Sequence, residues 1–391
     1  NIPVGVSDFT EIRQNGYYYI DKSGLIKDIL ETTSTKVTLI TRPRRFGKTL
    51  AMSMLDAFFD IRKESKKLFE GLEISKHQDL CAKWMNRYPT VFVSFRQVEG
   101  LDFAGAYDML TVVIANLFNK HIYLLDSKKA TEFQKKSFRQ LLSANASVKE
   151  VKSSIELLMN MLYDYYDKPV ILLIDEYDVP VAKANNNGYY NEMVLLIRNL
   201  FGNVLKTNDS LAFAVLTGCL RIAKESIFTG LNNFKIYSIT DKSFDETFGF
   251  TDNEVRELLK YYGQEEYYEI VKAWYDGYRF GDVEVYCPWD VINFCSDHRT
   301  DPGLAPKNYW ANTSGNSVIS HFIDSVGKPQ KLTRMELEQL VNGGIVQKEI
   351  NPELTYKELY SSIDNLWSTL FMTGYLTQRG EPDGDRYNLV I

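Results

Sequence analysis

The sequence predicts an α/β fold in which a three-layer domain with a parallel sheet is followed by a mostly helical region. Five short apolar runs, rich in β-branched and aromatic residues, lie in the first 240 residues with helix-length stretches between them. Near-continuous apolar strands that alternate with helices are typical of a parallel sheet covered on both faces. The 391 residues, at about 150 per domain, leave room for two or three domains.

The composition narrows the class of protein. An apolar fraction of 45% and a charged fraction of 25% are those of a globular chain, which excludes a mostly disordered one. Lys and Arg number 45 against 51 Asp and Glu, and this balance excludes a uniformly basic nucleic-acid coat. No apolar run reaches the roughly 18 residues of a membrane span, and four cysteines in so long a chain favour a reducing compartment. We therefore expect a soluble, cytoplasmic protein with no membrane partner.

The first 250 residues account for the α/β domain. The expected strands cover residues 37–40, 91–95, 170–174, 211–216 and 235–239. The helices between them place apolar residues on one face at 3.6-residue spacing. One such face follows the first strand and another precedes the third, formed by Leu50, Met54, Leu55 and Phe58 and by Leu157, Leu158, Met161 and Leu162.

The pattern changes in residues 251–391. Thr251 or Asp252 can begin a helix, with Glu254 placed for a capping box. Further apolar spacing and turn residues predict helices near 334–342 and 360–371 and a hairpin over 375–389. We expect this region to form a helical lid and a winged-helix-like part that pack on the α/β domain.

A phosphate-binding loop follows the first expected strand. Residues 41–50 read Thr-Arg-Pro-Arg-Arg-Phe-Gly-Lys-Thr-Leu and lead into a helix, whose N–H groups point at a bound anion. In the Walker A pattern G-x-x-x-x-G-K-[ST], Gly47 lets the backbone approach a phosphate and Lys48 reaches the β- and γ-phosphates. The Thr49 hydroxyl is the Mg²⁺ ligand of this pattern. Arg42 stands where the pattern has its first glycine, but the strand-to-helix context favours the motif.

A pair of carboxylates ends the third expected strand. Asp175 and Glu176 follow the apolar run 170–174, as in a Walker B element at the carboxyl edge of a parallel sheet. Asp175 is placed for the Mg²⁺ shell, and Glu176 for orienting and polarising an attacking water. Both halves of a metal–triphosphate site thus occur in the required order.

A third polar group, Thr217, ends the fourth expected strand. It would sense the γ-phosphate if this strand lies beside the phosphate-loop strand, which is the order of additional-strand ATPases. A simple Thr-Gly strand end is an equal alternative. Arg221 and Lys224 follow at i, i+3 and would face either phosphate or solvent.

Several motifs together resemble the predicted AAA-ATPase-like family of bacterial and archaeal proteins. They recur in order along nearly the whole chain: Tyr-Tyr-Ile-Asp-Lys-Ser at 18–23, Arg-Pro-Arg-Arg-Phe-Gly-Lys-Thr at 42–49, Ile-Asp-Glu-Tyr-Asp at 174–178, Arg-Ile-Ala-Lys-Glu-Ser-Ile-Phe at 221–228, Tyr-Asp-Gly-Tyr-Arg-Phe-Gly at 275–281 and Thr-Gly-Tyr-Leu at 373–376. The resemblance implies a P-loop ATPase that uses Arg-Pro-Arg-Arg-Phe in place of the usual first glycine. It also implies a nuclease-like domain of the PD-(D/E)xK type that begins about where this sequence stops, and through it a nucleic-acid partner.

The motifs lead to one set of candidate site residues. Nucleotide binding is assigned to the loop and the start of its helix, metal binding to a hydroxyl and a carboxylate, and catalysis to one residue from each Walker element and from the fourth strand. The three sets are Arg44, Arg45, Phe46, Gly47, Lys48, Thr49 and Leu50 for the nucleotide, Thr49 and Asp175 for the metal, and Lys48, Glu176 and Thr217 for catalysis.

Other residues have alternatives that the sequence leaves open. Arg44 and Arg45 would neutralise phosphate charge, act on the nucleotide of a neighbouring subunit, or pair with acidic side chains. The tyrosines and the aspartate of the motif at 18–23 would line an adenine pocket or pack in the core. Arg279 would be a lid arginine or part of an aromatic structural turn.

Two functions follow from these residues. The first is Mg²⁺-dependent ATP hydrolysis coupled to a conformational change of the C-terminal region or of an appended nuclease-like domain. The second is a nucleotide-gated switch or scaffold with negligible turnover that acts through partners. No Asn-Lys-x-Asp guanine reader is present, so ATP is favoured over GTP. Self-association into a homo-oligomer is compatible with both functions.

Overall fold

The computed structural model describes residues 2–32, 35–206, 208–220, 228, 233–310, 331–359 and 361–391, with the side chains of 331–333 excepted. Its centre is a five-stranded sheet in the order β2-β3-β4-β1-β5, with all neighbours parallel. The strands are β1 (Val37–Thr41), β2 (Thr90–Ser94), β3 (Val170–Asp175), β4 (Leu211–Gly218) and β5 (Phe234–Tyr237). All five expected strands are present to within a few residues, and the α/β prediction is confirmed.

The strand order brings the expected site elements together. β4 lies between β1 and β3, pairing Ile40 with Thr217 on one side and Ile174 with Leu216 on the other. The carboxyl ends of these three parallel strands therefore meet at one edge of the sheet, where α/β folds bind ligands. The condition attached to Thr217, that its strand lies beside the phosphate-loop strand, is met.

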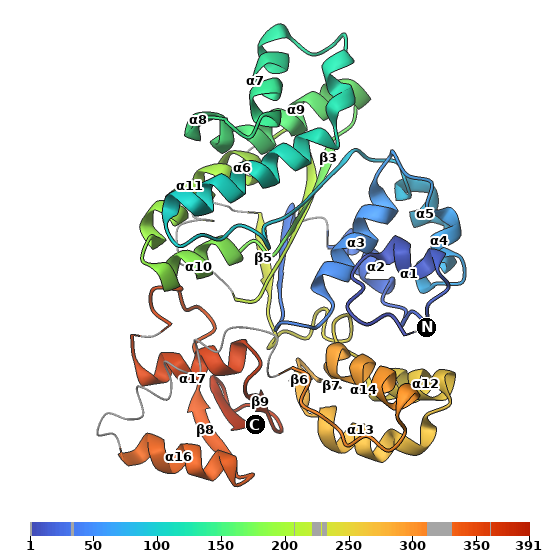
Figure 1. Cartoon of the computed structure of the whole chain (residues 1–391), viewed down its shortest axis with the longest axis vertical. Coiled ribbons are helices and arrows are strands. Elements are labelled where there is room, and N and C mark those ends of the chain that lie inside the picture. Colours follow the sequence, from blue (N-terminus) through green and yellow to red (C-terminus); the bar gives the residue numbers. More distant parts are fainter. Residues whose placement is uncertain are drawn as a thin grey trace.

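Helices cover both faces of the sheet, which gives the three layers (Figure 1). One face is covered by α3 (Lys48–Phe59), against which α1 (Phe9–Gln14) packs; α2 (Gly24–Glu31), α4 (Lys66–Phe69), η1 (Glu73–Lys76) and α5 (Gln78–Trp84) lie on the same side. The other face is covered by α6 (Phe103–Asn119), α9 (Ser154–Tyr166), α10 (Val179–Asn187) and α11 (Tyr190–Leu205). Met54, Leu55 and Phe58 of α3 are fully buried, as their spacing predicts.

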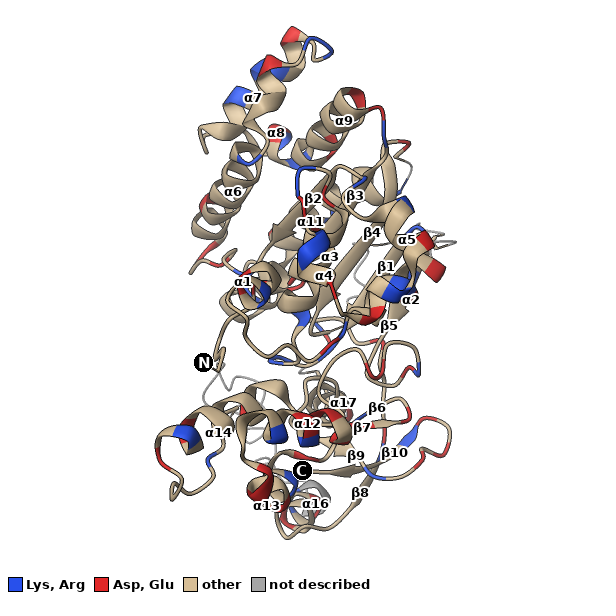
Figure 2. Cartoon of the chain, turned by 90° about the vertical axis from the view of Figure 1, so that its right-hand side faces the viewer, with Lys and Arg blue, Asp and Glu red and all other residues tan. Residues whose placement is uncertain are grey.

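Between β2 and β3 the chain forms a helical insertion at the end of the molecule away from the C-terminal region (Figure 1). It contains η2 (Ile122–Asp126), α7 (Glu132–Leu142) and α8 (Val148–Lys152) in addition to α6 and α9. Basic and acidic residues are intermixed along α7 and α8 (Figure 2). None of the helices in the described ranges is long and apolar enough to cross a membrane.

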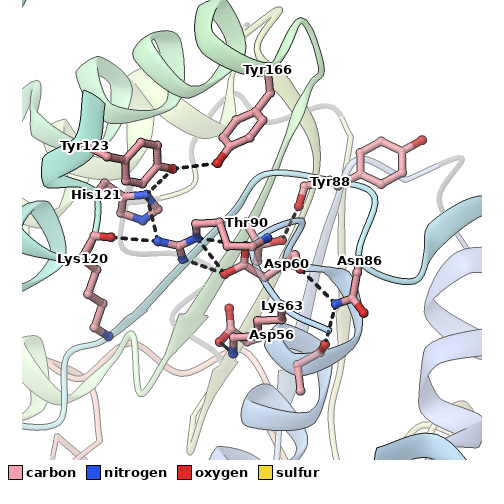
Figure 3. A network of polar contacts seen from close by, with 12 residues as sticks. Asp56, Asp60, Lys63, Asn86, Tyr88, Thr90, Lys120, His121, Tyr123 and Tyr166 are labelled. Atoms are coloured by element: carbon pink, nitrogen blue, oxygen red, sulfur yellow. Dashed lines mark hydrogen bonds and ion pairs between the residues drawn. The ribbon is translucent and has the colours of Figure 1, made fainter. Parts of the chain in front are cut away.

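A buried polar network joins this insertion to the end of α3 (Figure 3). The Asp60 carboxylate, fully buried, accepts from Arg62 Nε at 3.0 Å and from its terminal nitrogen at 2.6 Å. Arg62 also donates to the carbonyl oxygen of Lys120, the residue that caps the C-terminus of α6, at 2.8 Å. Burial, with help from Arg62 and Lys120, lowers the pKa of His121 to about 3, so the ring beside Arg62 is neutral. The network therefore ties the ends of α3 and α6 together through the partly exposed Arg62 guanidinium and a neutral histidine.

The C-terminal region combines helices with short antiparallel strands. One part contains α12 (Asp252–Tyr262), η3 (Glu265–Tyr267), α13 (Tyr268–Tyr275), the hairpin β6 (Tyr278–Phe280) and β7 (Val283–Val285), and α14 (Pro288–Thr300). The other contains α16 (Lys331–Val341), β8 (Val346–Glu349), α17 (Ile363–Met372), β9 (Thr377–Gln378) and β10 (Arg386–Val390), with the sheet order β8-β10-β9. Thr251 caps α12 and forms the expected capping box with Glu254. The expected hairpin is present as β9–β10, whereas β6, β7 and β8 were not expected from the sequence.

The two parts of this region differ in how they are packed. The helices of 252–300 enclose a small separate core, which includes Val255, Leu258, Val271 and Phe294 together with Ile20. In contrast, Leu366 and Trp367 of α17 belong to the same apolar cluster as the central sheet. The second part is therefore packed directly against the α/β domain.

Candidate functional site

The phosphate loop connects β1 to α3 and has a strongly turned backbone. Gly47 caps the N-terminus of α3 with φ +82°, a conformation that favours glycine. Arg45 also has a positive φ, 71°, although it carries a side chain. Alternation of positive and negative φ along the loop turns successive N–H groups toward one point, where they can bind an anion together with the helix N-terminus.

Lys48 lies inside this loop and is almost fully buried, with 6% of its surface exposed. Its ammonium donates to the carbonyl oxygens of Arg42 at 2.9 Å and Pro43 at 2.7 Å, and Cys219 Sγ lies 3.7 Å away. The loop carbonyls thus hold the ammonium at the centre of the loop, where a phosphate group would compete for it.

The Asp175 carboxylate is fully buried at the end of β3 and accepts hydrogen bonds from hydroxyl groups on three other elements. Thr49 at the start of α3 donates at 2.9 Å, Thr217 at the end of β4 at 2.8 Å, and Ser94 at the end of β2 at 3.3 Å. Within the described ranges Asp175 forms no ion pair, so the side-chain hydrogen bonds to this buried carboxylate come from neutral hydroxyl groups. A carboxylate beside a hydroxyl is the kind of oxygen donor set that Mg²⁺ takes in phosphate-binding sites.

Glu176 follows Asp175 in a left-handed conformation, with φ 52°. This conformation is unfavourable for a residue with a side chain and is concentrated at functional sites. Burial and the neighbouring Asp175 raise the pKa of Glu176, while Lys48 and Arg96 act in the opposite direction. The carboxylate is therefore within electrostatic reach of both Lys48 and Arg96.

The arginines of the loop have separate surroundings. Arg42 is fully buried: its terminal nitrogens donate to the carbonyl oxygens of Thr41 at 2.8 Å and Phe244 at 2.8 Å, with longer contacts to those of Tyr237 and Ser243. Burial lowers its pKa to about 10 against the opposing effects of Asp241 and Asp245, which leaves it charged at neutral pH. The residue in place of the first Walker A glycine therefore anchors the loop to β5 and the segment after it.

Arg44 and Arg45 have different neighbours. The Arg45 guanidinium lies over the Trp289 ring, 4.1 Å from its centroid. Burial lowers the pKa of Arg44, but the neighbouring Cys219, Tyr356 and Asp178 outweigh it and raise that pKa overall. Among the described residues neither arginine forms an ion pair, which leaves phosphate contact and action on a neighbouring subunit open.

Phe46 and Leu50, also expected to bind nucleotide, pack into apolar surroundings. Phe46 is buried against the rings of Tyr278 and Phe280, at centroid distances of 4.9 and 5.0 Å. Leu50 is half-buried against the main core. Their side chains fix the loop and α3 in place, and their backbone is the part that remains for a phosphate.

The residues that the sequence left with two interpretations now have defined neighbours. Tyr19 packs on Phe9 and its hydroxyl contacts Met54, and the Tyr18 ring stacks on Tyr261 at 4.4 Å. Asp21 accepts from the backbone N–H groups of Ser23 and Glu73. Arg279 pairs with Glu381 of the β9–β10 loop. These contacts favour the packing interpretations. Arg221 and Lys224 lie outside the described residues.

Sequence reasoning missed Ser94, Arg96, Asp178 and Cys219, which lie at or beside the same edge. Ser94 has the same signal as Thr217, a hydroxyl at the end of an apolar strand, and could have been found by it. Burial raises the pKa of Cys219, whose thiol therefore stays protonated beside Lys48.

The comparisons with known proteins agree with this architecture. The family described as "Predicted AAA-ATPase" matches residues 3–228, which include the phosphate loop, β3 and β4. A relative from Azotobacter chroococcum mcd 1, described as "Uncharacterized protein in vnfD 5'region", is 27% identical over 316 residues, which are 80% of this chain and 54% of the relative. The chain thus spans about half the length of the curated relative that it matches. Because the family match covers more than half of the chain, the protein belongs to the predicted AAA-ATPase family.

Proposed function

We propose that this chain binds ATP with Mg²⁺ and hydrolyses it, and that the nucleotide state changes the position of the C-terminal region. The observation that carries the proposal is the single carboxylate of Asp175, which receives hydroxyl groups from the phosphate-loop helix and from β4. Two Walker-type elements and a polar group on the strand between them thus meet at one point. A polar cluster with a purely structural role would not require β4 to lie between β1 and β3.

Each residue then has a role in phosphoryl transfer. Lys48 would leave the carbonyls of Arg42 and Pro43 to bind the β- and γ-phosphates. Thr49 and Asp175 would hold Mg²⁺, which when bound supplies positive charge against the phosphate oxygens. Thr217 would keep Asp175 oriented and contact the γ-phosphate. Arg44 stays available for phosphate on either the same or a neighbouring subunit.

Glu176 would orient the attacking water and accept its proton. This role requires an ionised carboxylate. Because its pKa is raised, Glu176 is half-protonated at a pH above the ordinary 4.5. Turnover at saturating ATP should therefore fall as pH decreases through that raised pKa, while it is fully retained at higher pH. The measurement is kcat against pH. An acid limb that persists unchanged in Glu176→Gln would assign the titration to another group.

Coupling to the C-terminal region is supported by three contacts with the loop itself. Phe46 packs on the β6 residues Tyr278 and Phe280. The Trp310 indole N–H donates to the carbonyl oxygen of Arg44 at 3.3 Å. A Cβ at Gly374 would lie 2.8 Å from Cβ of Pro43, so the backbone of Gly374 lies against the proline ring. A loop that rearranges around phosphate would therefore press on two parts of residues 251–391.

The division of the chain belongs to the same proposal. Residues 1–250 act as the ATPase domain, 251–310 as a helical lid, and 331–391 as a winged-helix-like unit with its three-stranded sheet. A nuclease-like domain after residue 391 would be the element moved, and would bring the nucleic-acid partner. The length of the Azotobacter relative is compatible with an additional domain.

The test is phosphate release by Glu176→Gln beside the wild-type chain, with ATP affinity measured in parallel. The amide cannot accept a proton, so we expect binding within about twofold and turnover lower by about 10²–10⁴-fold. Glu192→Gln, an exposed change on α11, is the matched control and should behave as wild type. Normal turnover in Glu176→Gln would remove Glu176 from the proposed role. Tight binding without turnover in the wild type would favour the nucleotide-gated switch.

A further inference from the structure

The two residues after the Walker B carboxylates hold the turn that follows β4. The Tyr177 hydroxyl donates to the carbonyl oxygen of Leu220 at 2.7 Å. Asp178 Oδ2 accepts from the backbone N–H groups of Cys219 at 2.8 Å and Leu220 at 3.1 Å. Gly218 leaves room for this, since a Cβ there would lie 2.5 Å from the Tyr177 ring and 2.8 Å from Asp178 Oδ1. Three backbone groups of the turn are thus fixed from the segment between β3 and α10.

The same Asp178 oxygen receives a third donor from the C-terminal region. The Tyr356 hydroxyl, from the segment between β8 and α17, lies 3.0 Å from Asp178 Oδ2. Both side chains are buried, with 2% of Asp178 and 8% of Tyr356 exposed. The Asn185 amide on α10 donates to the carbonyl oxygen of Tyr356 at 3.1 Å and fixes its backbone as well. Burial and Asp178 raise the pKa of Tyr356, so the hydroxyl keeps its proton and donates it.

The held turn is part of the candidate site. Thr217, whose hydroxyl is hydrogen-bonded to Asp175, is separated from the turn by Gly218 alone. Cys219, within it, has its thiol 3.7 Å from the Lys48 ammonium. A shift of the turn would therefore move the contacts of both Thr217 and Lys48. Phosphoryl transfer depends on positioning to a fraction of an ångström, so a group that fixes this turn affects turnover more than binding.

We propose that Tyr356 is a positioning residue for the nucleotide site: its hydroxyl, supplied by the 331–391 part of the chain, is the third donor to Asp178 Oδ2 and holds the turn after β4 in its working geometry. The C-terminal region thereby sets the rate of the site as well as responding to it. If the region moves with the nucleotide state, separation of Tyr356 from Asp178 switches the turn to a less productive position. The inference rests on the proposed ATPase function for its kinetic consequence and on the described contacts for its structural one.

The experiment compares the whole wild-type chain with Tyr356→Phe, which removes one oxygen and keeps the buried ring. Steady-state kinetics with Mg²⁺-ATP should show kcat lower by roughly 10- to 100-fold, with KM within about twofold. Amide hydrogen exchange, read on the peptide that contains Cys219 and Leu220, should become faster because their acceptor is less firmly held. Tyr275→Phe is the matched control, since it removes another buried hydroxyl of the C-terminal region, bonded to the carbonyl oxygen of Lys307. It should change neither readout.

A double-mutant cycle separates positioning from general packing. In an Asp178→Asn background, Tyr356→Phe should have little further effect on kcat, because the bond that it removes is already weakened. Equal kcat and equal exchange in Tyr356→Phe and Tyr275→Phe would overturn the inference. If the wild-type chain releases no phosphate, the proposed hydrolysis is wrong. The exchange of Cys219 and Leu220 then decides the inference alone: faster exchange in Tyr356→Phe supports it, and unchanged exchange overturns it.

Discussion

Replacing Lys48 by alanine should reduce ATP turnover by at least about 10²–10³-fold, the loss found when one preorganised donor to a reacting charge is removed. The ammonium lies in the centre of the loop, held by the carbonyl oxygens of Arg42 and Pro43. No other cationic side chain among the described residues occupies this position. ATP affinity should fall as well, because the proposed role of the lysine is to bind phosphates in the ground state and in the transition state. Phosphate release and titration with a fluorescent ATP analogue measure the two effects.

One further variant and one stability measurement make this prediction specific. Lys67→Ala, at an exposed position on α4, removes a lysine far from the loop and should leave both quantities unchanged. Thermal unfolding of Lys48→Ala should show a folded protein, since the lost hydrogen bonds are to two backbone carbonyls. Turnover of Lys48→Ala at the wild-type rate would mean that the loop is not the phosphate site.

Arg42→Gly should destabilise the protein by about 3–5 kcal/mol, although it recreates the complete G-x-x-x-x-G-K-[ST] pattern. The buried guanidinium satisfies carbonyl oxygens of β1, β5 and the segment after β5, and it lies over the rings of Phe248 and Phe280. Its removal leaves these carbonyls without donors and opens a cavity beneath the loop. The transition midpoint in a thermal melt should fall by about 6–20 °C.

The matched control is Arg87→Gly, the same exchange at an exposed loop position before β2. It should shift the midpoint by a few degrees at most. A stable Arg42→Gly protein that binds ATP more tightly than wild type would show that Arg42 merely obstructs a conventional loop, and would contradict its role as an anchor.

The sheet was predictable because its strands carry their signals locally. Apolar runs of four to six residues, each followed by a turn or a helix, are enough to identify parallel strands, and polar residues at their ends predict the binding edge. The position of β4 between β1 and β3 came from analogy with additional-strand ATPases, since pairing between distant strands leaves no local mark. β6 and β7 were not predicted, because strands of three residues are too short to show a period-2 pattern.

The site was predictable where one residue type has one role, and less so where the role depends on neighbours. Thr49 and Asp175 come from two separate motifs, and their side chains are hydrogen-bonded, as the motif positions lead one to expect. Arg42 and Phe46 belong to the same motif, yet their side chains serve packing against β5 and β6, which sequence spacing cannot reveal. Asp178 was overlooked because its partner, Tyr356, lies 178 residues further along the chain.

The neighbours of β1 also decide when the site can come into existence during synthesis. β1 pairs with β4 on one side and with β5 on the other, so its second side stays without a partner until the chain has been made as far as Tyr237. The roughly 200 residues in between take about 10–40 s at bacterial and eukaryotic elongation rates. Throughout that interval the sheet behind the phosphate loop is incomplete, and nucleotide has no complete site to stabilise. A ribosome-bound chain should therefore acquire ATP-dependent protease resistance only after β5 has left the exit tunnel.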